Sequence, residues 1–178
     1  MLGQLEIRKV RLPEDRDALE QLDASIITDE ICDIARERTG FVIQFVPVAP
    51  ITKTYSVDDL ATEQRLWEAG WVAFVGERLV GFVATRYERW NRRLAIWHLY
   101  VDATLRGRGI ARSLLETAFD HGRRQGALTA WLEVTNVNAP AVKAYEALGF
   151  TICGLDLTLY SHTEARGEVA LFMAQSLT

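Results

Sequence analysis

The chain has 178 residues, 49% of them hydrophobic and 25% charged, and its net charge is −4. This length and composition predict a single folded domain over residues 1–178 with a sizeable core, and they argue against a disordered chain. The negative charge argues against a nucleic-acid partner, because phosphate binding needs a broad basic surface. The sequence contains no stretch near the roughly 18 apolar residues that span a membrane, and its start, MLGQLEIRKV, lacks the apolar segment of a signal peptide. We therefore expect a cytoplasmic protein with no membrane partner.

Residues 1–69 predict short strands and helices in alternation. Their apolar spacing gives a strand over 5–10, a helix over 13–22, a short helix and loop over 28–39, a strand over 41–48, and a helix or helical turn over 58–69. Pro47 and Pro50 restrict the second strand to a sheet edge or an irregular extension, because proline donates no ladder hydrogen bond. Leu60 and Trp67 are expected to face inward.

The remaining residues alternate more regularly. The predicted elements are strands over 71–75, 79–87, 94–101 and 127–134, a helix over 109–125, a helix after residue 138, and a final strand pair over 150–160 and 169–174. Gly76 and Asn91 mark the turns of an antiparallel meander. Asn138 is a predicted N-cap, and Gly149 fits the position just past a helix end. The fold class is therefore α+β with a mixed sheet.

The stretch LYVDATLRGRGIARSLL, residues 99–115, combines a strand, a glycine-rich turn and a helix start. Such an arrangement exposes backbone N–H groups where the helix dipole favours an anion, and the two arginines in RGRG, residues 106–109, add positive charge. A P-loop is excluded because no Gly-Lys-Ser/Thr follows, and a dinucleotide-binding G-x-G-x-x-G is incomplete because Arg112 replaces its third glycine. The stretch predicts a pyrophosphate-binding loop.

Two motifs connect this loop to a known family. The loop reads Arg106-x-x-Gly109-x-Ala111, and some thirty residues later the chain reads Asn138-x-x-Ala-x-x-x-Tyr145-x-x-x-Gly-Phe. Together they resemble the GCN5-related N-acetyltransferases (GNAT). TKTY, residues 52–55, and the stretch LEVTNVNAPAVKAYEALGFTICGLDLTLYS are further similar to the streptothricin acetyltransferase branch of that family.

The resemblance implies a fold and an activity. The fold would be one GNAT-like α+β domain whose central, mostly antiparallel mixed sheet contains a splayed strand pair and is flanked by helices. Residues 1–69 would form an acceptor-side segment, 70–150 the acetyl-CoA-binding core, and 150–178 a C-terminal hairpin. The activity would be acetyl-CoA-dependent N-acetyl transfer, without a metal, and a homodimer is a further expectation of the resemblance.

The resemblance also implies which residues bind acetyl-CoA. The main chain of the strand before the loop would pair with the pantetheine arm, through Leu99, Tyr100 and Val101. The loop and helix start would hold the diphosphate, through Arg106, Gly107, Arg108, Gly109, Ile110, Ala111 and Arg112. Asn138 and Tyr145 map to later cofactor contacts, and a cofactor contact by Asn138 is compatible with its role as an N-cap.

Tyr145 is the expected general acid. A phenol with a pKa near 10 can give a hydrogen bond or a proton to the leaving thiolate, and the resemblance places a tyrosine in that role. The alternative is a core tyrosine. The general base stays open between Glu133, His98 and solvent: the acid that the family often carries on the strand over 94–101 is absent, and a lone histidine on an apolar strand is more often a core group.

Trp90 and Asp156 are expected to contact the acceptor, the first as a wall at a turn and the second as a charge partner for a cation. Neither Cys32 nor Cys153 lies in a motif, so we expect direct attack on the thioester in a ternary complex. The expected acceptor is a primary amine of a small cationic molecule such as a streptothricin-type antibiotic, which would make the protein an antibiotic-resistance enzyme. A protein or peptide amine, a polyamine, and a non-catalytic acetyl-CoA-binding sensory module are the alternatives.

Overall fold

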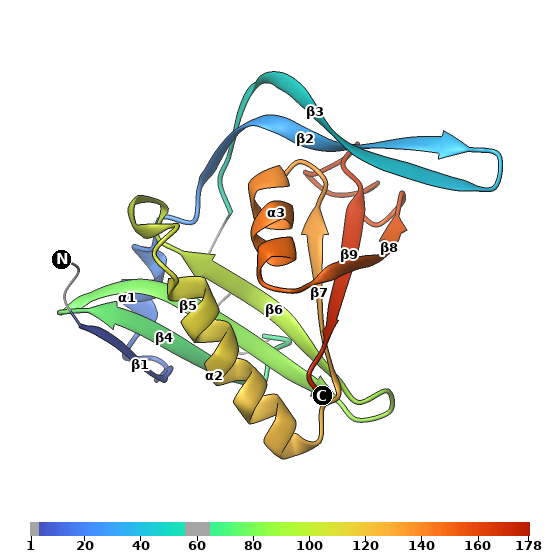
Figure 1. Cartoon of the computed structure of the whole chain (residues 1–178). Coiled ribbons are helices and arrows are strands. Elements are labelled where there is room, and N and C mark those ends of the chain that lie inside the picture. Colours follow the sequence, from blue (N-terminus) through green and yellow to red (C-terminus); the bar gives the residue numbers. More distant parts are fainter. Residues whose placement is uncertain (1–3, 56–64) are drawn as a thin grey trace. The chain divides into compact units, whose positions relative to one another are not determined.

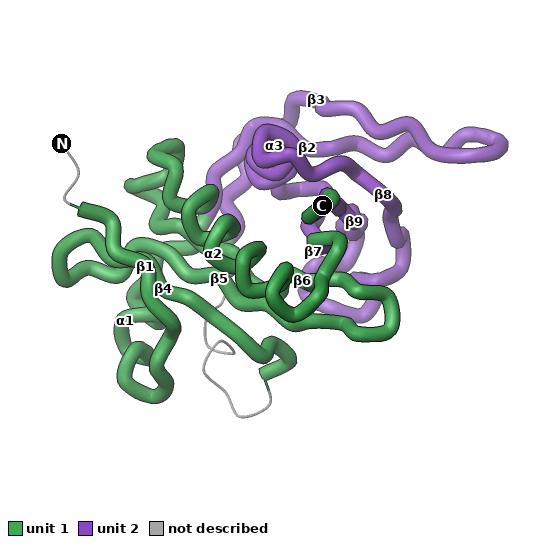
Figure 2. Tube along the Cα trace, turned by 60° about the horizontal axis from the view of Figure 1, so that its bottom comes forward, with its two compact units in different colours: residues 1–25, 54–130, 176–178 green, residues 26–53, 131–175 purple. Residues whose placement is uncertain are grey.

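The computed structural model describes residues 4–55 and 65–178. These residues form two compact units, shown in different colours in Figure 2. Unit 1 contains residues up to 25, 54–130 and 176–178, and unit 2 contains residues 26–53 and 131–175. The described residues form nine strands and three α-helices, so the predicted α+β class is confirmed. The prediction of one domain over the whole chain stays a prediction.

Four antiparallel strands form the sheet of unit 1 (Figure 1). In spatial order they are β1 (Leu5–Lys9), β4 (Ala69–Val75), β5 (Arg78–Glu88) and β6 (Arg93–Val101). A tight turn at Gly76, whose φ is +61°, joins β4 to β5 as predicted. All four predicted strands are confirmed within a few residues.

Helices lie on both faces of this sheet. The apolar side of α2 (Ile110–Gln125) packs so closely on β5 that a Cβ at Gly81 would lie 2.9 Å from Leu114 Cδ1. The next residue along β5, Phe82, instead belongs to a core cluster with Leu19 of α1 (Arg16–Glu20). Because neighbouring strand residues point to opposite faces, α1 and α2 cover opposite sides of β5.

The helix predicted over 58–69 is not found in the part of the chain that the structure describes. Residues 56–64, including Leu60, lie outside the described residues. The following residues lead directly into β4, and Glu68 N–H donates to the Thr85 carbonyl at 2.9 Å, so pairing with β5 replaces helical hydrogen bonds here. Trp67 faces inward as predicted: its side chain packs edge-on against Phe82, with ring centroids 5.7 Å apart.

A long antiparallel ribbon begins unit 2, formed by β2 (Ile26–Glu37) and β3 (Gly40–Lys53). The short helix predicted over 28–39 is therefore wrong. Cross-strand pairing such as Ile34 opposite Ile43 outweighs the weak local preference of this mixed stretch, because strand formation depends mainly on cross-strand neighbours. Both prolines of β3 are tolerated because each strand of a two-stranded ribbon has an unpaired edge, as predicted.

The rest of unit 2 combines three strands with α3 (Ala139–Ala147). The strands are β7 (Thr129–Thr135, of which residues 131–135 lie in unit 2), β8 (Thr151–Asp156) and β9 (Ala170–Ser176), in the spatial order β7, β9, β8 (Figure 1). The last two strands pair antiparallel, as the predicted closing hairpin requires.

The predicted caps of α3 are confirmed. Asn138 Oδ1 accepts a hydrogen bond from the Ala141 N–H at 3.2 Å, and Gly149, with a φ of +99°, follows the last turn. The predicted strand to residue 160 ends earlier, at Asp156, because the carboxylate of that residue folds the next residues into a turn. Among the described residues, no helix is both long enough and apolar enough to cross a lipid bilayer.

Candidate active site

The predicted anion loop lies in unit 1 and is fixed at its start by Asp102, which is only 2% exposed. Its carboxylate accepts hydrogen bonds from Thr104 N–H at 3.0 Å and Arg78 Nη2 at 2.6 Å, and its backbone N–H donates to the Val80 carbonyl. Burial raises the pKa of Asp102, but these hydrogen bonds and the Arg78 charge outweigh burial and lower it. The carboxylate therefore stays ionised and holds the loop against β5.

Gly107 and Gly109 give the loop its shape. Their φ angles are +75° and +82°, in the left-handed region that other residues rarely adopt, and a Cβ at either position would meet no protein atom within 4 Å. The first helical hydrogen bond of α2 runs from Ser113 N–H to the Gly109 carbonyl at 3.1 Å. The N–H groups of Ile110 and Ala111 therefore precede the helical ladder, at the positive end of the helix dipole.

Three arginines surround these backbone donors. Arg106, Arg108 and Arg112 are all exposed, and Arg106 Nε donates to the Val101 carbonyl at 3.1 Å, which ties that side chain to the end of β6. The loop thus combines glycine backbone with open space beside it, a helix N-terminus and guanidinium groups. This combination fits a phosphate-bearing ligand.

The predicted residues on β6 occupy different environments. His98 lies between aromatic rings: it stacks on Phe82 at 6.3 Å, and its Nδ1 is 3.5 Å from the Tyr100 hydroxyl. A bulge opposite Ala84 and Thr85 leaves Trp97 as an extra residue on β6, 40% exposed. Leu99 and Val101 point to the face opposite Tyr100 because the strand alternates.

Trp90, predicted to wall the acceptor site, lies at the turn between β5 and β6 and is 85% exposed. Its place in the acceptor site stays a prediction.

Glu133 of β7 belongs to a side-chain network in unit 2. The Tyr160 hydroxyl donates a hydrogen bond to Glu133 Oε1. The side chain keeps access to solvent, but the surrounding protein atoms displace enough water to raise its pKa, and the like charge of Glu168 adds to this rise. Lys53 opposes the shift because its positive charge favours the carboxylate.

Lys53 and Thr135 hold Glu168 in the same network. Lys53 Nζ forms an ion pair with Glu168 Oε2, and the Thr135 hydroxyl donates to that same oxygen. Thr135 and Glu133 are two residues apart on β7, so their side chains share one face of the strand. We call these five residues, Lys53, Glu133, Thr135, Tyr160 and Glu168, the Glu133 cluster.

A buried asparagine holds the backbone next to the cluster. Asn136, 8% exposed, donates from Nδ2 to the Cys32 carbonyl at 2.9 Å and accepts from Val169 N–H at 2.8 Å. The bond to Val169 fixes the backbone next to Glu168. Asn136 therefore ties β2 and the start of β9 to the end of β7.

Tyr145 and Asp156 also lie in unit 2. Tyr145 projects from α3, is half-buried, and packs its ring edge-on against Phe150 at 5.7 Å. Asp156 Oδ1 accepts hydrogen bonds from Thr158 N–H and Oγ1, both at 2.7 Å, and from Leu159 N–H at 3.1 Å. The Thr158 hydrogen bonds lower the pKa of Asp156. This carboxylate therefore shapes the loop that leads to Tyr160.

The two units thus divide the predicted site residues. Unit 2 contains Glu133, Asn138, Tyr145 and Asp156, whereas the loop, His98 and Trp90 belong to unit 1. Four members of the Glu133 cluster were not predicted as site residues from the sequence. Strand alternation from Glu133 could have indicated Thr135. No spacing pattern relates Lys53, Tyr160 or Glu168 to Glu133, because they come from other segments of the chain.

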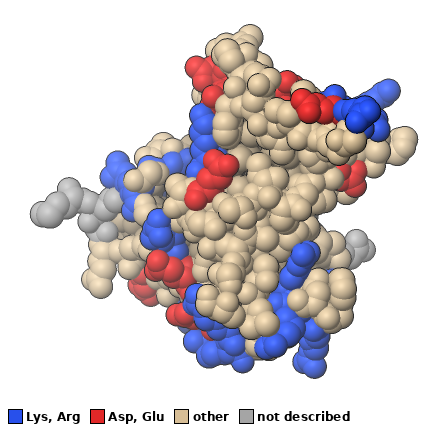
Figure 3. Space-filling model, turned by 45° about the vertical axis from the view of Figure 1, so that its right-hand side comes forward, with Lys and Arg blue, Asp and Glu red and all other residues tan. Residues whose placement is uncertain are grey.

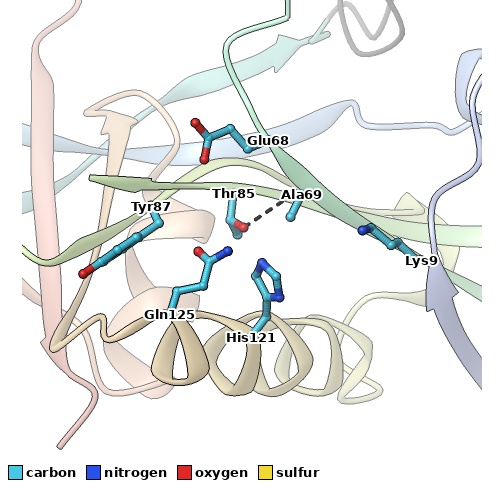
Figure 4. A pocket seen from close by; sticks show the side chains of 7 residues that line it. All are labelled: Lys9, Glu68, Ala69, Thr85, Tyr87, His121 and Gln125. Carbon is cyan, nitrogen blue, oxygen red and sulfur yellow. Dashed lines mark hydrogen bonds between the residues drawn. The ribbon is translucent and has the colours of Figure 1, made fainter. Parts of the chain in front are cut away.

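Unit 1 also contains a polar cavity of about 160 Å³ that none of the predicted site residues line (Figure 4). Its lining residues are Lys9, Glu68, Ala69, Thr85, Tyr87, His121 and Gln125. His121 projects from α2 and packs edge-on against Trp71, with ring centroids 5.0 Å apart. Burial, followed by the charges of Arg124 and Lys9, lowers the pKa of His121.

Surface charge is divided into small groups. Figure 3 shows small groups of acidic and of basic side chains on one face, separated by uncharged residues. Within the described ranges, 4–55 and 65–178, no three His, Cys, Asp or Glu side chains are grouped to hold a metal ion.

Comparisons with known proteins identify the family. A profile of the Acetyltransferase (GNAT) family matches residues 28–150. Streptothricin acetyltransferase of Streptomyces lavendulae is 40% identical over 95% of this chain and 93% of its own length, and that of Escherichia coli is 33% identical over 86% and 87%. The crystal structure of nourseothricin acetyltransferase matches with a TM-score of 0.88 and 39% identity, covering 98% of this chain and 99% of that chain. The chain belongs to the Acetyltransferase (GNAT) family and is an N-acetyltransferase that uses acetyl-CoA as its acetyl donor.

Proposed function

We propose that this enzyme acetylates a primary amine of a small cationic molecule of the streptothricin class by direct attack on acetyl-CoA. The observation that carries this proposal is the 40% identity to a streptothricin acetyltransferase over 95% of the chain. Similarity over nearly the full length includes the segments outside the shared acetyl-CoA motifs, where acceptor preference differs between acetyltransferases. The net charge of −4 also suits a cationic acceptor.

The loop before α2 has the features that a diphosphate needs. Left-handed backbone at Gly107 and Gly109, with open space where side chains would stand, lets a phosphate approach the main chain. The N–H groups at the start of α2, with Arg106, Arg108 and Arg112, would hold this part of the cofactor. The main chain of Leu99, Tyr100 and Val101 would pair with the pantetheine arm, and Asn138 would add a contact while it caps α3.

Acetyl-CoA supplies a thioester carbon, to which the amine nitrogen bonds as the carbon–sulfur bond breaks. The amine must be uncharged to attack, and we assign Glu133 as the group that takes up its proton. Burial raises the pKa of Glu133, which makes it a stronger base than an ordinary carboxylate. His98 is the less suitable candidate because its ring lies between those of Phe82 and Tyr100, on the face of its sheet that packs against the core.

Tyr145 is assigned as the general acid that gives a proton to the departing sulfur. Its half-buried position on α3 and its edge-on contact with Phe150 hold the ring in one orientation. The proton count closes over one turnover. Glu133 takes the proton that the amine loses before attack and later gives it to solvent. Tyr145 protonates the thiolate, and the second proton lost from the amine nitrogen as the amide forms restores the Tyr145 phenol.

Direct attack requires that no cysteine first takes the acetyl group. Cys32 is fully buried, and burial raises its pKa to about 11, so its nucleophilic thiolate is strongly disfavoured. Cys153 lies exposed on β8, outside both acetyl-CoA motifs. A Cys153→Ser variant is therefore expected to keep full activity.

The test is release of the CoA thiol from acetyl-CoA over a panel of amines. We expect streptothricin to give the highest kcat/KM, ahead of peptides with a free N-terminus and of polyamines. A higher kcat/KM for a peptide or polyamine would replace the proposed acceptor. Thermal stabilisation by acetyl-CoA with no thiol release for any amine would indicate a non-catalytic binding module instead.

A further inference from the structure

Tyr160 enters the Glu133 cluster from the loop that follows β8. Its hydroxyl donates to Glu133 Oε1, and the ring is half-buried. Tyr160 lies 27 residues from Glu133 in sequence, near the end of the stretch LEVTNVNAPAVKAYEALGFTICGLDLTLYS and outside the two acetyl-CoA motifs. Those two motifs therefore do not explain its contact with Glu133.

The loop holds Tyr160 in place from both sides. On the N-terminal side, Asp156 Oδ1 accepts three hydrogen bonds from Thr158 and Leu159. On the C-terminal side, the Tyr160 carbonyl accepts hydrogen bonds from Thr163 N–H and Oγ1, both at 3.0 Å. Because the backbone of Tyr160 is already held, less entropy is lost when its hydroxyl makes a further contact.

The charged groups that face Glu133 come from separate elements. Lys53 comes from the end of β3, and Glu168 comes from the residues before β9. Their mutual ion pair and the Thr135 hydroxyl engage Oε2 of Glu168. The Tyr160 hydroxyl gives its hydrogen bond to Glu133 itself.

We propose that Tyr160 is a positioning residue for acetyl transfer, which holds the Glu133 carboxylate in the orientation and ionised state needed to accept the acceptor's proton. This inference rests on the proposed role of Glu133 as the base. The acyl carbon is not contacted by Tyr160 in this scheme; the residue acts through Glu133. A hydroxyl that donates to a carboxylate favours its charged form, so the contact also limits how far burial raises the pKa of Glu133.

The test replaces the hydroxyl alone, in Tyr160→Phe, and follows kcat/KM for streptothricin from pH 5.5 to 9.5 by thiol release. Loss of the hydrogen bond destabilises the ionised carboxylate. We therefore expect the acid limb of the pH profile, where kcat/KM falls as Glu133 becomes protonated, to move upward by about half to one pH unit. Looser orientation of Glu133 should also lower the plateau by about three- to tenfold. The KM for acetyl-CoA should not change, and thermal melting checks that the variant is folded.

Two further variants separate this inference from the proposed function. Glu133→Gln should abolish the acid limb that moves in Tyr160→Phe. Adding Tyr160→Phe to Glu133→Gln should lower kcat/KM no further, because both substitutions remove the same hydrogen bond. If Glu133→Gln keeps full activity and the limb, the base assignment is wrong and the inference falls with it. If Glu133→Gln loses the limb while Tyr160→Phe leaves it at the wild-type pH, only the inference is overturned.

Tyr87→Phe is the matched control. It removes a hydroxyl of the same kind from the cavity of unit 1, where no proposed catalytic or binding residue lies. We expect wild-type kcat/KM and an unmoved acid limb. An equal shift in Tyr87→Phe would show that loss of any tyrosine hydroxyl perturbs the enzyme, and it would overturn the specific role of Tyr160.

Discussion

The loop before α2 and the Glu133 cluster present two kinds of chemistry. The loop offers backbone N–H groups that do not titrate, in a shape set by Gly107, Gly109 and the buried carboxylate of Asp102. The cluster offers side chains that do titrate, brought together from β3, β7 and the segment between β8 and β9. Substitutions in the loop should therefore change cofactor affinity at every pH, whereas substitutions around Glu133 should change the rate and its pH dependence.

The largest expected effect concerns Tyr145, the proposed proton donor. Tyr145→Phe removes the phenol and keeps the ring that packs on Phe150. We expect kcat to fall about 100-fold or more, the lower range for general acid catalysis, with little change in the Kd for acetyl-CoA. Thiol-release kinetics and calorimetric titration measure the two quantities. An unchanged kcat between pH 7 and 9 would remove Tyr145 from this role.

The second prediction concerns the loop. In Gly109→Val a β-branched side chain must adopt a φ of +82°, and it occupies space that we assign to the diphosphate. We expect the Kd for acetyl-CoA to rise about tenfold or more, since roughly 1–2 kcal/mol of backbone strain and a steric conflict add together. The acid limb of the surviving activity should not move.

Gly76→Val supplies the control for this strain. Gly76 also has a positive φ, +61°, and open space around its Cβ position, but it lies in the hairpin between β4 and β5. The variant should lose comparable stability and keep acetyl-CoA affinity. Equal losses of affinity in the two variants would show that backbone strain, and not the diphosphate, explains the Gly109 result.

The contrast between a loop shaped by nearby residues and a cluster built from distant segments also explains which parts of the molecule could be predicted from the sequence. The loop, α2 and the caps of α3 are specified within a few residues, by Gly109, Asn138 and Gly149, so a local pattern was enough. The ribbon of β2 and β3 depends on pairs such as Ile34 with Ile43, and local preference suggested a helix instead. Long-range pairing overrides weak propensity.

Within the site, Glu133 could be named from its place on a strand, but its partners could not. Tyr160 and Glu168 lie in the segment that connects the paired strands β8 and β9, so their positions depend on that pairing and on the turn at Asp156. Lys53 is 115 residues from Glu168 in sequence. No spacing rule relates residues whose proximity depends on the complete fold of unit 2.

A smaller effect is expected at Lys53. Lys53→Met keeps most of the aliphatic chain and removes the charge that favours the ionised form of Glu133, and it leaves Glu168 without its ion pair. Both changes raise the pKa of Glu133, so the acid limb of kcat/KM should move upward by up to about half a pH unit, with a few-fold lower activity near pH 6. Arg36→Met, on the exposed end of the ribbon, is a control of matched charge change. A downward shift of the limb in Lys53→Met would contradict the arrangement of the cluster.

The smallest effect separates stability from activity. His121 has a pKa below the ordinary 6.5 because burial and the charges of Arg124 and Lys9 disfavour its protonated form. The unfolded chain binds this proton more readily, so the favourable contribution of neutral His121 is complete above about pH 7 and is lost as the pH falls through the lowered pKa. Since the ring is partly exposed, the loss should stay below about 1 kcal/mol. In His121→Gln, urea unfolding at pH 7.5, 6.0 and 5.0 should show a shallower decline, while the acid limb of kcat/KM stays where it is. A limb that moved with His121 would mean that titration in unit 1 reaches the rate, and the assignment of that limb to the Glu133 cluster would fail.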